Sequence, residues 1–423
     1  MTIEVLDKKI SDGYDDQFAL LYGEAAAGQK ARYHRLTQAF CGEFGKRDGA
    51  RLLSVPGRSE VCGNHTDHNN GRVLACAVDL DVIAVAASTG DNTVRIKSEG
   101  FPMDVVSLGS LAPVEEEKNR SAALVRGVCA RLKSLGYKVG GFDAYTTSNV
   151  LKGSGLSSSA AFEVMTANII SVLFNDGKID PVEMAKAGQY AECEYFGKPC
   201  GLMDQTACAV GSFITIDFKD TENPVIEKLD FDFAKTGYSL CIVDTAGDHA
   251  DLSGDYAAIR NEMMSVARLL GQSTLRGCDE QKFFADIAEI REKAGDRAVL
   301  RAIHFFGDNT RVLDEVAALK AGNFNAFLLQ TVASGRSSYM YLQNIYAISQ
   351  PSKQGLGLAL ALCEQLLSEK GAWRVHGGGF AGTIQAFVPQ ERIALFTKTM
   401  NGVFGENACH ILSVRPVGAY CFE

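Results

Sequence analysis

The chain has 423 residues, which is long for one hydrophobic core and predicts two domains. Its 46% hydrophobic and 22% charged residues are typical of a soluble globular protein. The formal net charge of −9 argues against nucleic acid or an anionic membrane as the main partner, but it leaves an anionic small molecule open.

Neither export nor membrane insertion is indicated. The first residues, "MTIEVLDKKISDGYDD", are acidic and contain no apolar stretch like that of a signal peptide. No segment offers the roughly 20 apolar residues that a membrane span needs. The 12 cysteines include no C-x-x-C pair and stand mostly in apolar runs, which favours reduced, buried thiols. We therefore expect a cytoplasmic protein.

Helices and strands alternate through the first half of the chain. Apolar residues at spacings of three and four predict helices over residues 15–27 and 32–44. Strands are predicted over residues 50–57, ended by Pro56 and Gly57, and over 92–98, 141–148 and 212–218. The long apolar run of residues 72–88 predicts one buried strand or a pair of them. Further helices are predicted over residues 121–136, 156–174 and 181–197.

A polar segment at residues 219–228 is the best candidate for a domain boundary, and it divides the chain into 1–222 and 223–423. A strand (238–245) and a helix (255–270) follow it, and further helices extend to about residue 370. A last strand (383–389) and a last helix complete the chain. Because the strands show no regular βαβ order, we expect a two-domain α+β fold.

The segment "KGSGLSSSAAFE" (152–163) has the composition of a phosphate-binding loop. Its glycines allow close backbone approach, and its serines begin a helix whose free N–H groups suit a phosphate. It is neither a Walker A loop nor a dinucleotide-binding fingerprint. A glycine turn into a serine-capped helix is an equally good interpretation of this segment alone.

Two other segments have open meanings. "GNHTDHNNG" (63–71) could hold a metal, a sugar or only its own turn. "HGGGFAG" (376–382) lies between a predicted helix and a strand, and it could be a tight connection or a loop that packs against a nucleotide or the first glycine loop.

Four segments in order carry a family resemblance: "PGRSEVCGNHTDHNNG", "GSGLSSSAAFE", "GKPCGLMDQ" and "HGGGFAGT". The chain resembles the GHMP kinase superfamily and, within it, the galactokinase family, whose first motif typically reads P-G-R-V-N-L-I-G-E-H-T-D-Y-N-G-G. The resemblance covers residues 50 to 390. It implies a ribosomal-protein-like N-terminal domain, a C-terminal α+β domain and an active site in the cleft between them.

The resemblance also implies binding of ATP and Mg²⁺. Mg²⁺ would be held by Ser159 and Glu192, although a solvated helix face beside Glu194 is the alternative for Glu192. Gly378 and Gly379 would pack near the nucleotide. The ATP phosphates would lie on Gly153, Ser154, Gly155, Leu156, Ser157, Ser158 and Ser159.

The remaining implied roles concern the sugar. Asp204 would face the anomeric hydroxyl, and Arg58 would keep that carboxylate ionised. Without the resemblance, a helix N-terminal carboxylate and an ordinary salt bridge would be the better interpretations of these two. The expected sugar contacts are Asn64, His65, Asp67, Gly201 and Tyr256.

The resemblance implies transfer of the ATP γ-phosphoryl group to C1 of galactose, by a monomer or weak homo-oligomer whose partners are the sugar and ATP. Asn64 stands where the family has glutamate, so a kinase for galacturonate or a modified hexose is the first alternative. A non-catalytic sensor of sugar and ATP is the second. A metalloenzyme built on His65, Asp67 and His68 is the third.

Overall fold

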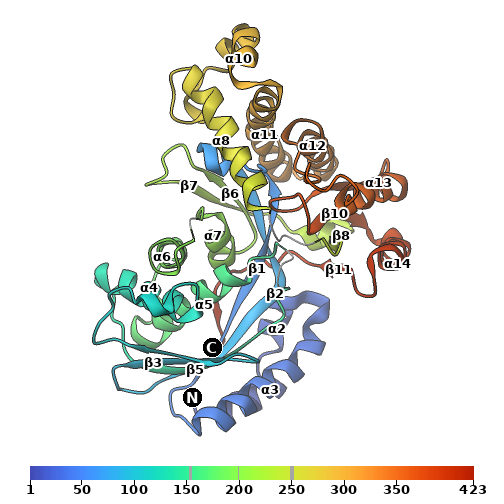
Figure 1. The fold of residues 1–423 in the computed structure, drawn as a ribbon. Coiled ribbons are helices and arrows are strands. Elements are labelled where there is room, and N and C mark those ends of the chain that lie inside the picture. Colours follow the sequence, from blue (N-terminus) through green and yellow to red (C-terminus); the bar gives the residue numbers. More distant parts are fainter. Residues whose placement is uncertain (152–154, 199, 248–251) are drawn as a thin grey trace.

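The computed structural model describes residues 1–151, 155–198, 200–247 and 252–423, with the side chain of Ser253 excepted. It contains two β-sheets with helices packed around them (Figure 1). Both chain ends lie beside the larger sheet, where the Lys9 ammonium donates to the backbone oxygen of Glu423 at 3.0 Å. None of the helices in the described part of the chain is long and apolar enough to cross a membrane.

The larger sheet has eight strands in the order β12-β1-β2-β5-β3-β4, with β6 paired to β2 and β7 paired to β6. Among its named strands all pairs are antiparallel except β3 with β5. The strands are β1 (Arg51–Cys62), β2 (Arg72–Ser88), β3 (Thr93–Ser98), β4 (Met103–Ser107), β5 (Phe142–Ser148), β6 (Phe213–Asp217), β7 (Val225–Leu229) and β12 (Tyr420–Cys421).

Helices cover both faces of this sheet. In β2, Val82, Ala84 and Ala86 join the core on the side of α5, whereas Ile83 and Val85 join the core under α3. Burial on both faces explains why this strand is an unbroken apolar run. One side carries α1 (Ile3–Asp12), α2 (Asp15–Tyr22) and α3 (Ala26–Phe44); the other carries α4 (Ser121–Ser134), α5 (Ser158–Phe174), α6 (Pro181–Ala191) and α7 (Met203–Val210).

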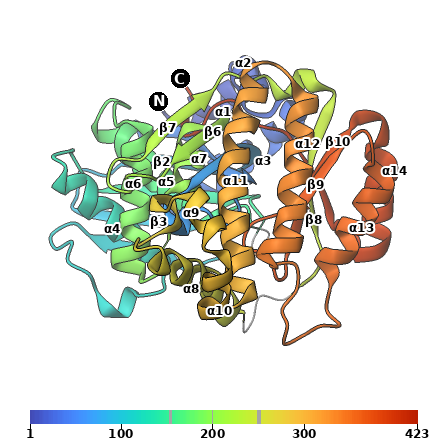
Figure 2. The same cartoon turned by 90° about the horizontal axis from the view of Figure 1, so that it is seen from above.

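The smaller sheet has the order β11-β8-β10-β9. Two long helices, α11 and α12, run side by side next to it, and α13 and α14 lie on its outer side (Figure 2). Its strands are β8 (Tyr238–Asp244), β9 (Ala372–Val375), β10 (Thr383–Pro389) and β11 (Cys409–Leu412). The helices are α8 (Ser253–Leu269), α9 (Glu280–Ala285), α10 (Ile287–Ala294), α11 (Asp296–Lys320), α12 (Phe324–Ser337), α13 (Gly355–Leu367) and α14 (Ile393–Phe404).

The α+β fold class and the predicted helices are confirmed, and two details are corrected. The first strand does not end at Pro56 and Gly57, because β1 continues to Cys62 through a register shift that accommodates the proline. The segment "HGGGFAG" does not follow a helix. It connects β9 to β10, and β9 has only four residues, which is too short for a periodicity to show.

The expected boundary segment, residues 219–228, covers a turn between two paired strands and most of the second of these strands. Residues 219–224 connect β6 to β7, and both strands belong to the larger sheet. The chain passes to the smaller sheet between Leu229 and Tyr238. The division at residues 222 and 223 therefore stays a proposal about domains, whereas the change of sheet lies a few residues later.

Candidate functional site

A bidentate ion pair joins the first and third sequence motifs. Arg58 lies on β1 and is 6% exposed, and Asp204 stands in the first turn of α7. The guanidinium donates to both carboxylate oxygens, Nε to Oδ1 at 2.8 Å and Nη2 to Oδ2 at 2.7 Å. It also donates to the backbone oxygen of Gly155. The pair predicted from the sequence thus exists, and it contacts the glycine-serine loop.

Asp204 is held in its ionised form. Burial alone would raise the pKa of this carboxyl, but the charge of Arg58 and hydrogen bonds from Arg58 and Ser157 outweigh it and lower the pKa below its ordinary value. An ionised carboxylate can accept a proton from a hydroxyl or orient it. This environment therefore suits a general base or an orienting group.

Replacing Arg58 with methionine is expected to move the pH profile of the reaction. Burial would then act on Asp204 without its main opposing charge, so the pKa would rise and the carboxylate would be lost at higher pH. We expect the acid limb of kcat/KM to move up by about 1–3 pH units. Profiles from pH 4 to 9 for both proteins measure this shift, and coincident acid limbs would contradict the role of Arg58.

The glycine-serine loop lies against the strand that carries Arg58. The Leu156 oxygen accepts from the Arg58 backbone N–H at 3.2 Å, and a Cβ on Gly57 would come within 2.9 Å of the same oxygen. Ser157 takes a left-handed conformation (φ 57°) immediately before α5. Gly155 faces the His376 ring, so the glycine-serine loop and the segment "HGGGFAG" meet, as one interpretation predicted.

The helix start after this loop is solvent-accessible in part. Ser158 and Ser159 form the first turn of α5 and are half-buried. Free N–H groups at such a helix start can receive an anion. The predicted phosphate contacts Gly153 and Ser154 lie outside the described residues.

A cluster of carboxylates and amides lies next to Asp204. Glu192 is 4% exposed, and its carboxylate accepts from the Lys198 ammonium at 2.8 Å and from the Gln205 amide at 3.0 Å. The same amide donates to Glu163 at 2.9 Å. Glu194 is exposed instead, which favours Glu192 over it as a functional residue.

This cluster offers oxygen atoms of the kind that bind a divalent cation, although it contains only two carboxylates. Ser159 and Glu163 are four residues apart on α5 and so share one face of the helix. Glu163 Oε1 is buried and has no hydrogen-bond partner among the described residues. Burial and the nearby charge of Glu192 raise the pKa of Glu163. Hydroxyl and carboxylate oxygens are the ligand types that Mg²⁺ prefers.

His65 is fixed as a neutral imidazole. Its Nε2 donates to the Gly378 oxygen at 2.9 Å, which leaves Nδ1 as an acceptor. Burial, together with the neighbouring His68, lowers its pKa to about 4. His65 can therefore accept a hydrogen bond from a hydroxyl at neutral pH.

The other predicted sugar contacts gather beside His65. Asp67 Oδ1 accepts from the His68 backbone N–H at 2.9 Å, and a Cβ on Gly201 would come within 3.0 Å of Asp67 Oδ2. The Tyr256 hydroxyl donates to the Gly379 oxygen at 2.9 Å. Gly378 and Gly379, which the resemblance places near the nucleotide, thus contact His65 and Tyr256 through their backbone oxygens.

Asn64 is arranged differently from the expectation. It is fully buried, and its Nδ2 donates to Glu60 Oε1 at 2.9 Å and to the Gly377 oxygen at 2.8 Å. Its Oδ1 accepts from Asn344 at 2.8 Å and from Ser338 at 3.3 Å. Its carboxamide therefore has no hydrogen-bonding position left over for a ligand.

The described side chains do not support the metalloenzyme alternative built on His65, Asp67 and His68. Within the described ranges, no three histidine, cysteine, aspartate or glutamate side chains are grouped as metal ligands. The imidazole Nε2 of His65 and the carboxylate Oδ1 of Asp67 have the backbone partners given above.

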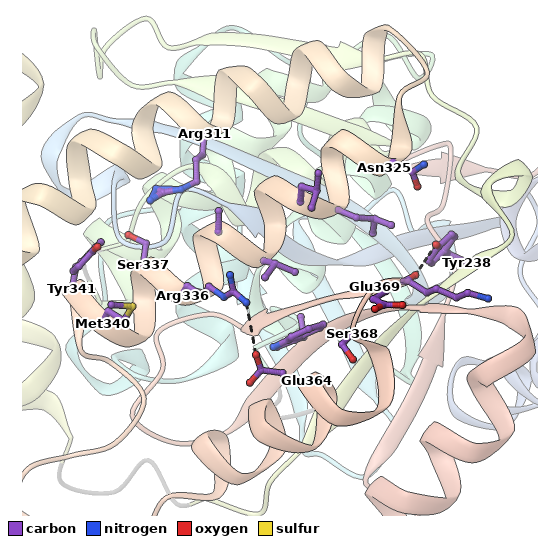
Figure 3. Close-up of a pocket in the computed structure, with 17 residues that line it drawn as sticks. Tyr238, Arg311, Asn325, Arg336, Ser337, Met340, Tyr341, Glu364, Ser368 and Glu369 are labelled. Carbon is purple, nitrogen blue, oxygen red and sulfur yellow. Dashed lines mark hydrogen bonds and ion pairs between the residues drawn. The ribbon is translucent and has the colours of Figure 1, made fainter.

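A large cavity lies away from these residues. It has a volume of about 690 Å³ between α12 and the β9–α13 side of the smaller sheet, and Figure 3 shows Tyr238, Arg336 and Glu364 around it. The Arg336–Glu364 ion pair there spans 3.7 Å between two exposed side chains, so it contributes little. The site around Asp204 is therefore identified by its ionised carboxylate and ion pair, and not by the volume of a cavity.

Comparison with known sequences agrees with this choice. The family profile "GHMP kinases N terminal domain" matches residues 123–212, and "Galactokinase galactose-binding signature" matches residues 38–88. The galactokinase of Actinobacillus pleuropneumoniae is 31% identical over 368 residues, which cover 84% of this chain and 90% of that protein. The chain belongs to the galactokinase family. The galactokinase of Streptomyces coelicolor is likewise 31% identical, over 90% of this chain and 94% of its own.

Solved structures show the same fold. A galactokinase from Lactococcus lactis complexed with galactose has a TM-score of 0.76 at 22% identity and covers 92% of this chain and 99% of its own. The mevalonate kinase of Methanococcus jannaschii has a TM-score of 0.60 at 16% identity, over 87% of this chain and 99% of its own. The GHMP kinase fold expected from the sequence is thereby confirmed.

Sequence reasoning missed three residues of the site. Lys198 and Gln205 both stand in the third motif, "GKPCGLMDQ", and both contact Glu192. Glu163 ends the second motif and looked like an ordinary helix residue. For Lys198 and Gln205 the available signal was their place in one of the motifs that carry the family resemblance. The sequence held no signal for Glu163, because its hydrogen bond with Gln205 depends on how α5 packs against α7.

Proposed function

We propose that the protein transfers the γ-phosphoryl group of ATP to the C1 hydroxyl of galactose. The observation that carries this proposal is the ionised Asp204 carboxylate, paired to Arg58 and bonded to Ser157 of the glycine-serine loop. A hydroxyl held at Asp204 would lie next to a phosphate held at that loop. The 31% identity to galactokinases over most of the chain supports galactose as the sugar.

Phosphoryl transfer depends on positioning and on charge neutralisation. In this proposal the loop residues Gly153 to Ser159 bind the phosphates through their N–H groups and hydroxyls. Ser159 and Glu192 hold Mg²⁺, which supplies positive charge to the phosphates when it is bound. Lys198 adds a second positive charge, because its side chain is 61% exposed and so can turn from Glu192 towards a phosphate.

The sugar would lie between Asp204 and the group formed by His65, Asp67, Gly201 and Tyr256. His65 Nδ1 and the Asp67 carboxylate offer acceptors for hydroxyl groups, whereas Gly201 leaves room beside Asp67. The Tyr256 ring packs edge-on against Phe380, with ring centroids 5.4 Å apart. This fixed aromatic wall limits how the sugar can turn.

A panel of sugars at fixed Mg-ATP tests the substrate. We expect ADP release with galactose to exceed that with glucose, mannose and galacturonate, with kcat/KM at least about 100-fold higher for galactose. The Asp204→Ala variant serves as the background control. Turnover of galacturonate without turnover of galactose would overturn the proposal, and binding of both galactose and ATP without any turnover would favour the sensor.

A further inference from the structure

Glu60 lies on the same strand as Arg58 and faces the same side. Residues 58–60 of β1 pair without interruption opposite residues 77–75 of β2, so side chains two residues apart point to one face. At about 3.3 Å per residue, the Cα atoms of Arg58 and Glu60 are separated by about 6.6 Å. This is comparable to the length of a hexose ring with its C6 substituent.

The two carboxylate oxygens of Glu60 have different surroundings. Oε1 accepts from the Arg374 guanidinium at 3.0 Å and from Asn64 Nδ2 at 2.9 Å. Oε2 accepts from none of the residues that the structure describes, yet the side chain keeps 9% exposure. The carboxylate is thus held by hydrogen bonds at Oε1, whereas Oε2 can still accept a hydrogen bond.

Charged residues of both the Arg58 ion pair and the proposed sugar contacts act on the pKa of Glu60. Burial raises the pKa of Glu60, the charges of Arg374 and Arg58 lower it, and the charge of Asp67 raises it further. Glu60 therefore lies within electrostatic range of both Arg58 and Asp67. Its hydrogen-bond partner Asn64 directly precedes His65, a proposed sugar contact.

The sequence shows an exchange at this place. The first motif of the family has asparagine at the position of Glu60 and glutamate at the position of Asn64, whereas this chain has them the other way round. The two side chains are hydrogen-bonded to each other at 2.9 Å. The net charge of the two side chains is therefore the same as in the family motif, but here the carboxylate stands on β1. All hydrogen-bonding positions of the asparagine carboxamide are taken by protein groups.

We infer that Glu60, rather than Asn64, determines which sugar the site accepts. Its free Oε2 receives a hydroxyl at the end of the sugar away from C1, and its negative charge repels a carboxylate there. The site thus takes neutral hexoses with a free distal hydroxyl and rejects uronic acids. This inference rests on the proposed phosphorylation of galactose at C1.

The test compares how galactose and galacturonate bind. The Michaelis constant of galactose and the inhibition constant of galacturonate against galactose are measured for the wild type and for Glu60→Gln. We expect the inhibition constant of galacturonate to fall by about 10- to 100-fold in Glu60→Gln, because a like charge is removed and Arg374 is freed. The KM for ATP should stay within about threefold, because the described hydrogen bonds of the Glu60 carboxylate are to Arg374 and Asn64.

Two further variants keep the test decisive. Glu194→Gln makes the same chemical change at an exposed residue and should leave the inhibition constant at the wild-type value. Glu60→Gln combined with Arg374→Met removes both buried charges and serves if the single variant does not fold; its inhibition constant should also fall. An inhibition constant in both Glu60 variants equal to that of Glu194→Gln would overturn the inference. Loss of galactose turnover in the wild type would instead overturn the proposed function.

Discussion

The Asp204→Asn variant is expected to lose about 10²- to 10⁴-fold in kcat, the usual effect of removing a positioned acid or base. The amide keeps the size of the side chain and can still accept from Arg58. It cannot take the hydroxyl proton, and its NH₂ group faces either Arg58 or the sugar unfavourably. Steady-state rates with galactose and Mg-ATP measure this loss.

The Michaelis constant for ATP provides the control for this variant. Asp204 contacts the glycine-serine loop through the hydroxyl of Ser157. The carbonyl oxygen of Asn can still accept from this hydroxyl, so nucleotide affinity should change by only a few fold. A variant that retains more than about a tenth of wild-type kcat would show that Asp204 is neither the base nor the group that orients the hydroxyl.

The Asp81→Asn variant is expected to lose about 3–5 kcal/mol of unfolding free energy, as when one partner of a buried ion pair is removed. Asp81 is fully buried on β2 and accepts from Arg32 at 2.5 Å and from Arg415 at 3.2 Å. The hydroxyls of Tyr22 and Ser54 also donate to it, both at 2.5 Å. Without the carboxylate, two buried guanidinium groups lose their counter-charge. Denaturant unfolding measures the difference.

The effect of Asp81 should also depend on pH. Burial opposes ionisation, but the two arginines and the hydroxyl donors lower the pKa of Asp81 below its ordinary value. The carboxylate therefore stabilises the fold fully above about pH 5, and this stabilisation is lost as the pH falls through the lowered pKa. Asp176→Asn, at an exposed residue paired with exposed Lys178, should change stability by less than about 1 kcal/mol. Equal losses in the two variants would contradict the account of Asp81.

Local pattern was enough to predict much of the fold. The apolar run of residues 72–88 is one buried strand, and residues 158–174 form a helix that begins with serines, because both signals depend only on neighbours in the chain. Strand β9 escaped prediction for the opposite reason: its four residues become a strand only by pairing with β10. The proline within β1 also led to the wrong prediction that the first strand ends there. A proline fits inside this strand because the pairing register with β2 shifts next to it.

Long-range contacts account for what the sequence could not predict at the site. Asn64 looked like a specificity residue in its motif, yet its carboxamide is bound by Ser338, Asn344 and Gly377, which are more than 270 residues away. The partner of Glu60 is Arg374, 314 residues away. Such pairs become visible only when the two sheets come together. The Arg58–Asp204 pair could be expected because the family resemblance links their motifs.

The most direct test of the account is the identity of the product. Purified protein is incubated with galactose, Mg²⁺ and ATP, and the products are identified by ³¹P and ¹³C NMR. The account predicts ADP and a sugar phosphate whose phosphorus is coupled to C1 of galactose. ADP with inorganic phosphate alone, or a phosphate on another carbon of the sugar, would contradict the placement of the C1 hydroxyl at Asp204.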